Sequence, residues 1–140
     1  MPNLNQPRLV TGHAVSRNGR GDMGQAVIAH GPYSPGGAQN HYLIGVGADC
    51  ELMSGGAQVL GCVSFQDGNP EEVGPNGVSI EALLAVCADR LERFQDGPHA
   101  NLYNAEALQG IERALEALKD RTRERDYRAG QGMTPVNQFL

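Results

Sequence analysis

Residues 79–118 read SIEALLAVCADRLERFQDGPHANLYNAEALQGIERALEAL, and this stretch decides the fold. Its first part carries apolar residues at helical spacing, which predicts one helix with an apolar face made of Ile80, Leu83, Leu84, Cys87, Leu91 and Phe94. QDGPHA then breaks the helix, because Pro98 cannot continue the hydrogen-bond ladder and Gly97 suits a left-handed cap. Ser79 and Asn101 can cap the two helices on either side of this break.

The second part of the stretch has a narrower apolar seam, with a spacing of three, four and three along Leu108, Ile111, Leu115 and Leu118. A seam of this coiled-coil type indicates that more than one chain packs together. A short connection between two helices makes an antiparallel hairpin, so we predict a two-helix hairpin over residues 79–128. Residues 129–140 are predicted to form a C-terminal tail.

Residues 1–78 have a different character, because short runs rich in Val, Ile, Leu and Tyr alternate with loops rich in Gly, Pro and Asn. The runs RLVTGHAV, QAVIAH, HYLIGVGA and QVLGCVSF begin at Arg8, Gln25, His41 and Gln58. Such runs are typical of strands, and they predict a small antiparallel sheet or partial barrel. The fold class is therefore α+β, with an N-terminal antiparallel β-sheet region followed by the C-terminal helical hairpin, assembling as an oligomer.

The chain has 140 residues, a formal net charge of -5 and a pI near 5.3. This balance argues against a nucleic-acid partner, because general nucleic-acid binders are normally basic. No apolar run reaches membrane-spanning length and no signal-peptide pattern is present, so we expect a soluble intracellular protein with no membrane partner. Cys50, Cys62 and Cys87 show no metal-binding spacing, so we expect them to be reduced and buried.

Both ends of the predicted hairpin carry polar residues close to its apolar seam. Asn104 lies near the seam at the head of the second helix, whereas Arg121 and Arg125 lie near it at the foot. Head and foot are about 25 Å apart along a helix, so Phe94 and Asn104 cannot share one small ligand with the arginines of their own chain. The simplest explanation is that both ends protrude into water. If hairpins instead pack head to foot between chains, a ring and an amide meet two guanidinium groups, a set that suits a nucleotide.

Other candidate sites have weaker support from the sequence. The four histidines, His13, His30, His41 and His99, have no metal-ligand spacing, so we expect neither metal nor cofactor. The serines considered as nucleophiles have no base that the sequence identifies: Ser16, Ser54, Ser64 and Ser79.

Arg17 and Arg20 flank a glycine-rich loop that can form an anion nest, which makes them candidates for a second pocket. FQDG occurs at residues 65–68 and again at 94–97, and we interpret the repetition partly as coincidence.

Residues 61–132 resemble the helical-hairpin segment shared by phage anti-Thoeris and anti-CBASS sponges. The resemblance rests jointly on FQDGNPEEVGPNG, EALL, RLERFQDGPHA, NAEAL and RTRER, and the upstream strand NHYLIGV fits as well. Because a β region precedes the hairpin, the chain is more similar to the anti-Thoeris sponges than to the shorter, all-helical anti-CBASS sponges.

The resemblance implies a homohexamer that binds glycocyclic ADP-ribose between subunits without cleaving it, with separate pockets for cyclic di- or trinucleotides in some members. By motif position it implies that Phe94 stacks on the base and Asn104 reads the base or ribose. It implies that Arg121 and Arg125 clamp phosphates from the neighbouring chain. The chain departs from the pattern at HANLYN, so we add His99 and Tyr103 to the candidate pocket.

We therefore expect a non-enzymatic phage sponge that sequesters cyclic nucleotide immune signals in the cytoplasm of the infected bacterium. It would block Thoeris immunity, with CBASS immunity as a second candidate. Two alternatives stay open, namely a cyclic-nucleotide hydrolase that uses the same pocket and an oligomeric phage structural protein that binds no nucleotide.

Overall fold

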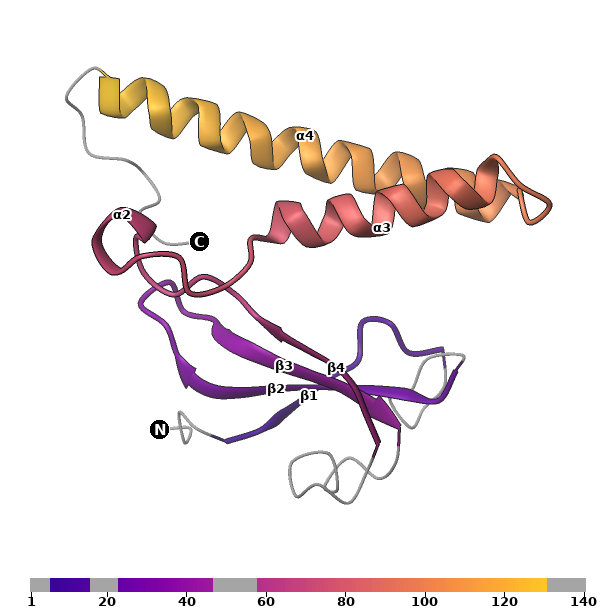
Figure 1. Cartoon of the computed structure of the whole chain (residues 1–140), viewed down its shortest axis with the longest axis horizontal. Helices are drawn as coiled ribbons and strands as arrows, with labels where there is room; N and C mark the ends of the chain where they lie inside the picture. Colours follow the sequence, from indigo (N-terminus) through magenta and orange to yellow (C-terminus); the bar gives the residue numbers. More distant parts are fainter. Residues whose placement is uncertain (1–5, 16–22, 47–57, 131–140) are drawn as a thin grey trace. The chain divides into compact units, whose positions relative to one another are not determined.

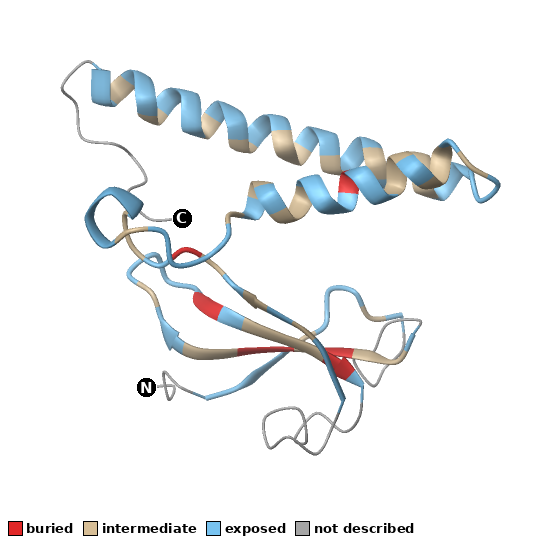
Figure 2. Ribbon diagram, viewed as in Figure 1, coloured by how far each residue is buried: buried red, intermediate tan, exposed pale blue. Residues whose placement is uncertain are grey.

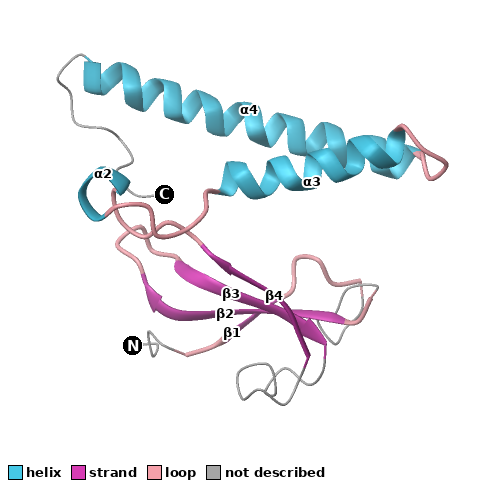
Figure 3. Cartoon of the chain, viewed as in Figure 1, coloured by secondary structure: helices cyan, strands magenta, loops and turns pink. Residues whose placement is uncertain are grey.

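The computed structural model describes residues 6–15, 23–46 and 58–130, and the chain divides into two compact units between Gly77 and Val78. Among its described residues, the first unit contains four strands and a short helix, namely β1 (Arg8–Val10), β2 (Gln25–Tyr33), β3 (Gln39–Val46), β4 (Gln58–Ser64) and α2 (Pro70–Val73) (Figure 1). The second contains α3 (Ile80–Gln95) and α4 (Leu102–Gly130), joined by a tight turn (Figure 3). The predicted α+β class, with an antiparallel sheet before a helical hairpin, is confirmed.

The sheet is an antiparallel meander in the order β1-β2-β3-β4. All four predicted strands are present, but the first ends at Val10 instead of continuing to Val15. The reason is a turn in which the amide of Ala14 donates to the carbonyl of Thr11 at 2.9 Å. Within this turn, the His13 ring lies with Nε2 2.8 Å from the carbonyl oxygen of Gln25.

The core of the sheet is small and partly polar. Ala26, Ile28 and Ala29 of β2 are buried, and Figure 2 shows the buried positions of the sheet on β2 and β3. Gln39 is only 1% exposed, and its Nε2 donates to the carbonyl oxygen of Gly31 at 2.9 Å. A buried amide needs such partners, so the side-chain hydrogen bond of Gln39 helps to fix how β2 and β3 pair.

The first FQDG closes the sheet unit with a loop that the sequence did not predict in detail. Gln66 is buried, and its side chain accepts from the amide of Asn76 at 2.9 Å and donates to the carbonyl of Gly74 at 3.0 Å. The helix α2 lies in the chain between Gln66 and these two partners, and the Asn69 side chain caps its N-terminus. Gly77 lies directly against the backbone of Phe65, where a Cβ would collide.

The hairpin follows the predicted local signals closely. The Ser79 hydroxyl accepts from the amide of Ala82 at 3.1 Å, and the Asn101 side chain accepts from the amide of Asn104 at 2.8 Å. Both predicted caps are therefore present. Gly97 is not left-handed, contrary to expectation, because α3 ends on Asp96 in right-handed conformation instead. Within the described ranges, no helix is both long and apolar enough to cross a membrane.

The two helices bury less than the sequence predicts. Ala88 is the buried residue of α3, and Figure 2 shows the rest of the two helices as half-buried or exposed. The seam from Leu108 to Leu118 is only half-buried in the single chain, because a two-helix hairpin covers each helix on one side. Cys87 is exposed, as is Cys62 on β4, so the prediction that these cysteines are buried is wrong; Cys50 lies outside the described residues.

Candidate ligand-binding site

The turn end of the hairpin presents a partly covered aromatic ring. Phe94, in the last turn of α3, is half-buried. The guanidinium of Arg90 lies 4.9 Å from its ring centroid, and the ring of His99 meets it edge-on at 6.4 Å with an interplanar angle of 88°. Arg90 was missed as a candidate, although its spacing of four residues from Phe94 on a helix is the signal for such a pair.

The loop beside Phe94 is held by a reciprocal amide contact. Gln95 Oε1 accepts from the amide of Asn101 at 3.0 Å, and Gln95 Nε2 donates to the Asn101 carbonyl at 3.1 Å. Only the backbone amide of Asn104 is used for capping, and its side-chain amide has no partner among the described residues. Tyr103 is 82% exposed. The turn therefore offers an aromatic ring, an unpaired amide and an exposed phenol on a fixed loop.

The opposite, open end of the hairpin presents two half-buried arginines. Arg121 Nη2 donates to Glu81 Oε1 at 3.0 Å, which joins α4 to the first turn of α3. Arg121 Nε and both Nε and Nη2 of Arg125 are buried without a hydrogen-bond partner among the described residues. Buried guanidinium donors without acceptors are costly, so this end of the hairpin needs an acceptor that the single described chain does not supply.

Other cations of α4 do not share this deficit. Arg123 contacts Asp120 at 2.7 Å and Glu116 at 3.2 Å, and these hydrogen bonds raise the pKa of Arg123. Lys119 and Arg128 likewise lie against carboxylates of their own helix. These are exposed pairs, which contribute little to stability. Lys119, Arg123 and Arg128 are therefore paired within their own helix, whereas Arg121 and Arg125 keep buried donor nitrogens without acceptors among the described residues.

The structure keeps the two groups of predicted residues apart within one chain. Phe94, His99, Tyr103 and Asn104 lie at the turn, whereas Arg121 lies beside Glu81, about 20 Å away along α3. This agrees with the distance argument from the sequence. A site that combines both groups needs a second chain, and that assembly stays a prediction. Arg17 and Arg20, the candidates for a second pocket, lie outside the described residues.

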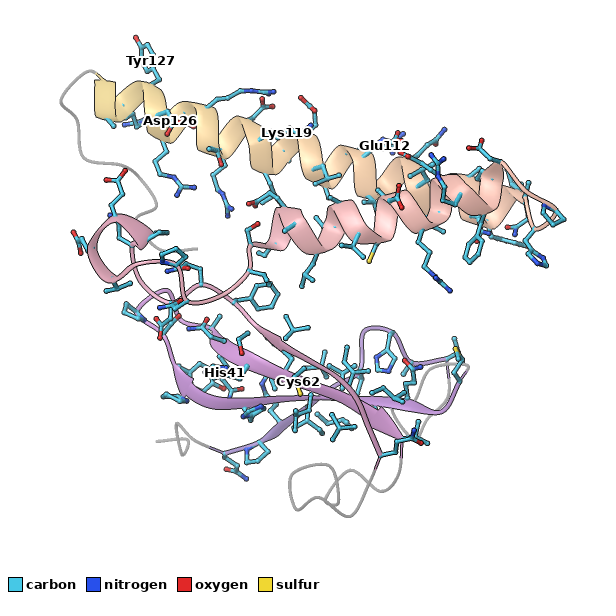
Figure 4. The ribbon with its side chains drawn as sticks, viewed as in Figure 1. His41, Cys62, Glu112, Lys119, Asp126 and Tyr127 are labelled. Atoms are coloured by element: carbon cyan, nitrogen blue, oxygen red, sulfur yellow. The ribbon has the colours of Figure 1, made fainter. Side chains whose placement is uncertain are left out.

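One pair on the sheet was missed altogether. His41 Nδ1 lies 2.9 Å from the Ser64 hydroxyl across β3 and β4, and the His41 ring stacks on His30 at 5.6 Å. The sequence identified no base for Ser64, and the structure places the His41 ring beside it. The two residues are 23 positions apart and meet only through strand register, which the sequence does not display. Figure 4 labels His41 on the sheet, together with Cys62.

Comparison with known proteins identifies the hairpin. A family model described as the Acb2/Tad1 hairpin domain matches residues 62–123. "Thoeris anti-defense 1" of Bacillus phage SBSphiJ7 is 37% identical over 94 residues, which cover 67% of this chain and 66% of that protein. The chain belongs to the Acb2/Tad1 hairpin family. It matches just under two thirds of the relative's length.

The Acb2/Tad1 hairpin match spans both ends of the candidate site. It begins in β4, contains Phe94, Asn104 and Arg121, and stops two residues before Arg125. Glu81 and Arg90 also lie inside the matched range. Within the described part of the chain, no group of three or more His, Cys, Asp or Glu side chains is placed to hold a metal ion.

Proposed function

We propose that this protein is a phage anti-defence sponge that binds cyclic nucleotide immune signals and releases them unchanged. Its expected ligand class is glycocyclic ADP-ribose, with cyclic di- and trinucleotides as further candidates. Its site of action would be the cytoplasm of the infected host, where it would block Thoeris immunity. Similarity to a protein named for Thoeris anti-defence supports this biological role.

The observation that carries the chemical proposal is the set of buried, unpartnered donors at the open end of the hairpin. Arg121 Nε and two nitrogens of Arg125 lack acceptors, and guanidinium groups bind phosphate oxygens with strong, directional hydrogen bonds. A ligand with two phosphates would supply acceptors for both arginines. Capture by charge-assisted hydrogen bonds requires no bond to break, so binding alone accounts for removal of the signal.

The turn end would complete the pocket from another copy of the chain. Phe94 supplies a ring on which a base can stack, and the unpaired amide of Asn104 can read the edge of a base or a ribose hydroxyl. His99 and Tyr103 border this surface. A homo-oligomer that packs turn end against open end would bring both groups onto one ligand, and a closed homohexamer is the assembly we propose.

A depletion assay tests the proposal directly. Excess protein is mixed with glycocyclic ADP-ribose, cyclic dinucleotides or cyclic trinucleotides, then filtered, and the retained fraction is heated and assayed. We expect loss of the signal from the filtrate and recovery of the intact molecule. Replacing both Arg121 and Arg125 with Ala should weaken binding by at least about a hundredfold. The matched control is Arg123→Ala, which removes a self-paired cation from the same helix.

The contact between His41 and Ser64 lies on the sheet and not at the hairpin pocket. It therefore favours a hydrolase at a separate site and gives no support to one that uses the same pocket. A serine nucleophile needs an oriented base and an oxyanion site, and no carboxylate contacts His41 among the described residues. Recovery of only ligand fragments, abolished by Ser64→Ala, would establish the hydrolase and refute the sponge. No depletion of any signal would favour the structural alternative.

A further inference from the structure

Glu81 is the one described carboxylate that contacts either of the two acceptor-deficient arginines. Its Oε1 accepts from Arg121 Nη2 at 3.0 Å, and the residues are 40 positions apart in the chain. Their side chains are 26% and 28% exposed, respectively, whereas the other ion pairs of the hairpin are more exposed on at least one side. The pair is therefore partly shielded from water, where a charge-assisted hydrogen bond is stronger than at the surface.

The geometry of this contact leaves Arg121 only partly satisfied. Glu81 engages one terminal nitrogen, while Nε stays buried without a partner. A guanidinium is planar, so holding one terminal nitrogen fixes the direction of the remaining N–H groups. Arg125 lies one helical turn further along α4 on the same side. The carboxylate therefore restrains one arginine without consuming the donors that an anion would use.

We propose that Glu81 is a positioning residue of the anion site, which orients Arg121 before the ligand arrives. This inference rests on the proposed function, because it assigns a role within the same site. Without the carboxylate, Arg121 must lose side-chain freedom when it binds the ligand, and that loss reduces affinity. Glu81 thus acts by holding the Arg121 side chain in place before the ligand binds. It does not need to contact the ligand itself.

The test compares three substitutions in the full-length protein by calorimetric titration with glycocyclic ADP-ribose and, separately, inorganic pyrophosphate. Glu81→Ala removes the acceptor and should weaken binding about tenfold. Glu81→Gln keeps an acceptor oxygen in the same place and should restore affinity to within about threefold of the unmodified protein. Glu116→Ala is the matched control, because it removes an equal charge that pairs with Lys119 and Arg123 and with neither Arg121 nor Arg125 among the described residues.

A double-mutant cycle separates positioning from a general structural role. In an Arg121→Ala background, Glu81→Ala should have no further effect on affinity for either probe, because the residue that it orients is gone. Circular dichroism of each variant checks that the hairpin is still folded. A structural role would instead weaken binding in both backgrounds.

The outcomes of the two proposals are distinguishable. If the unmodified protein binds neither probe, the proposed function fails and the role of Glu81 fails with it. If the unmodified protein binds but Glu81→Ala binds equally well or more tightly, the positioning role alone is overturned. Failure of Glu81→Gln to restore affinity would also overturn it, because the charge and not the orientation would then be decisive.

Discussion

The two copies of FQDG show how one tetrapeptide serves two regions of the molecule. The first follows β4 and the second ends α3. In both, the glutamine side chain accepts a hydrogen bond from a backbone amide in the loop that follows. Gln66 accepts from Asn76, and Gln95 accepts from Asn101. The interpretation of the repetition as partly coincidence stays a prediction, although the glutamine holds the following loop in each copy.

The copies differ in their aromatic and glycine residues. Phe65 packs edge-on against Tyr42 of the sheet at 5.7 Å, whereas the ring of Phe94 meets the ring of His99 edge-on and lies 4.9 Å from the Arg90 guanidinium at the hairpin turn. Gly68 is left-handed with φ of 85°, whereas Gly97 is not. The glutamine therefore holds the following loop in the same way in both copies. The phenylalanine and the glycine differ in their surroundings, which indicates a structural role for the first copy and a candidate binding role for the second.

Replacing each phenylalanine with alanine is the strongest challenge to this comparison. Phe65→Ala should destabilise the protein by about 2–3 kcal/mol, because it removes a ring packed on the sheet, and should leave ligand affinity unchanged. Phe94→Ala should lower affinity for glycocyclic ADP-ribose about tenfold through lost stacking. Urea unfolding and calorimetric titration measure the two effects. Equal effects of both variants on affinity would contradict the division of roles.

Replacing each glutamine sharpens the comparison at the shared position. Gln66→Ala should cost about 2 kcal/mol, because it leaves the amide of Asn76 without an acceptor next to a buried site. Gln95→Ala should cost about 1 kcal/mol, because its partner Asn101 is exposed and water can replace the lost contacts. Urea unfolding compares the two variants. A larger loss of stability in Gln95→Ala than in Gln66→Ala would contradict this predicted order.

The glycine pair should give a smaller difference. Gly68→Ala should destabilise by about 1 kcal/mol, because alanine strains a left-handed backbone, and its Cβ would lie 3.2 Å from Val73. Gly97→Ala should be close to neutral, since its Cβ would meet the Arg93 carbonyl at an ordinary 3.5 Å. Thermal unfolding of the two variants distinguishes these cases, and a strongly destabilised Gly97→Ala would refute the assigned conformation.

The smallest expected effect concerns pH and should be confined to the sheet that holds the first copy. Burial, and secondly the charge of His41, lower the pKa of His30. The stability that depends on neutral His30 is present above the ordinary histidine pKa of about 6.5 and is lost as pH falls through the lowered value. Urea unfolding between about pH 7.5 and 5.5 should show this loss. His30→Gln should remove it, and an unchanged profile in that variant would exclude His30 as the cause.

Local signals explain which parts of the fold the sequence predicted. Caps at Ser79 and Asn101, and apolar runs in the strands, act over a few residues and were read correctly. The helix α2 was missed although Asn69 and Pro70 form a recognisable start, because four residues leave no periodic pattern. Cys87 was assigned to a buried face because helical spacing cannot say which part of an apolar face the partner helix covers.

The candidate site was predicted in its residue types but not in its internal contacts. Spacing placed Phe94 and Arg121 at opposite ends of the hairpin, and the structure agrees. The pairing of Arg121 with Glu81 joins positions 40 apart, and no pattern along the chain encodes a contact at that separation. The same limit applies to His41 and Ser64, whose contact depends on strand register.

The unequal length of the two helices has a consequence for how this protein can evolve. Because Arg121 faces the first turn of α3, the rest of α4 to Gly130 extends past its partner helix (Figure 1). Figure 4 shows Tyr127 on this extension, pointing away from α3. Mutations there change few contacts of the hairpin itself, so selection can alter the chemistry around Arg125 at little risk to folding. Under the proposed function, such a segment would allow the anion site to follow changes in the chemistry of its ligand.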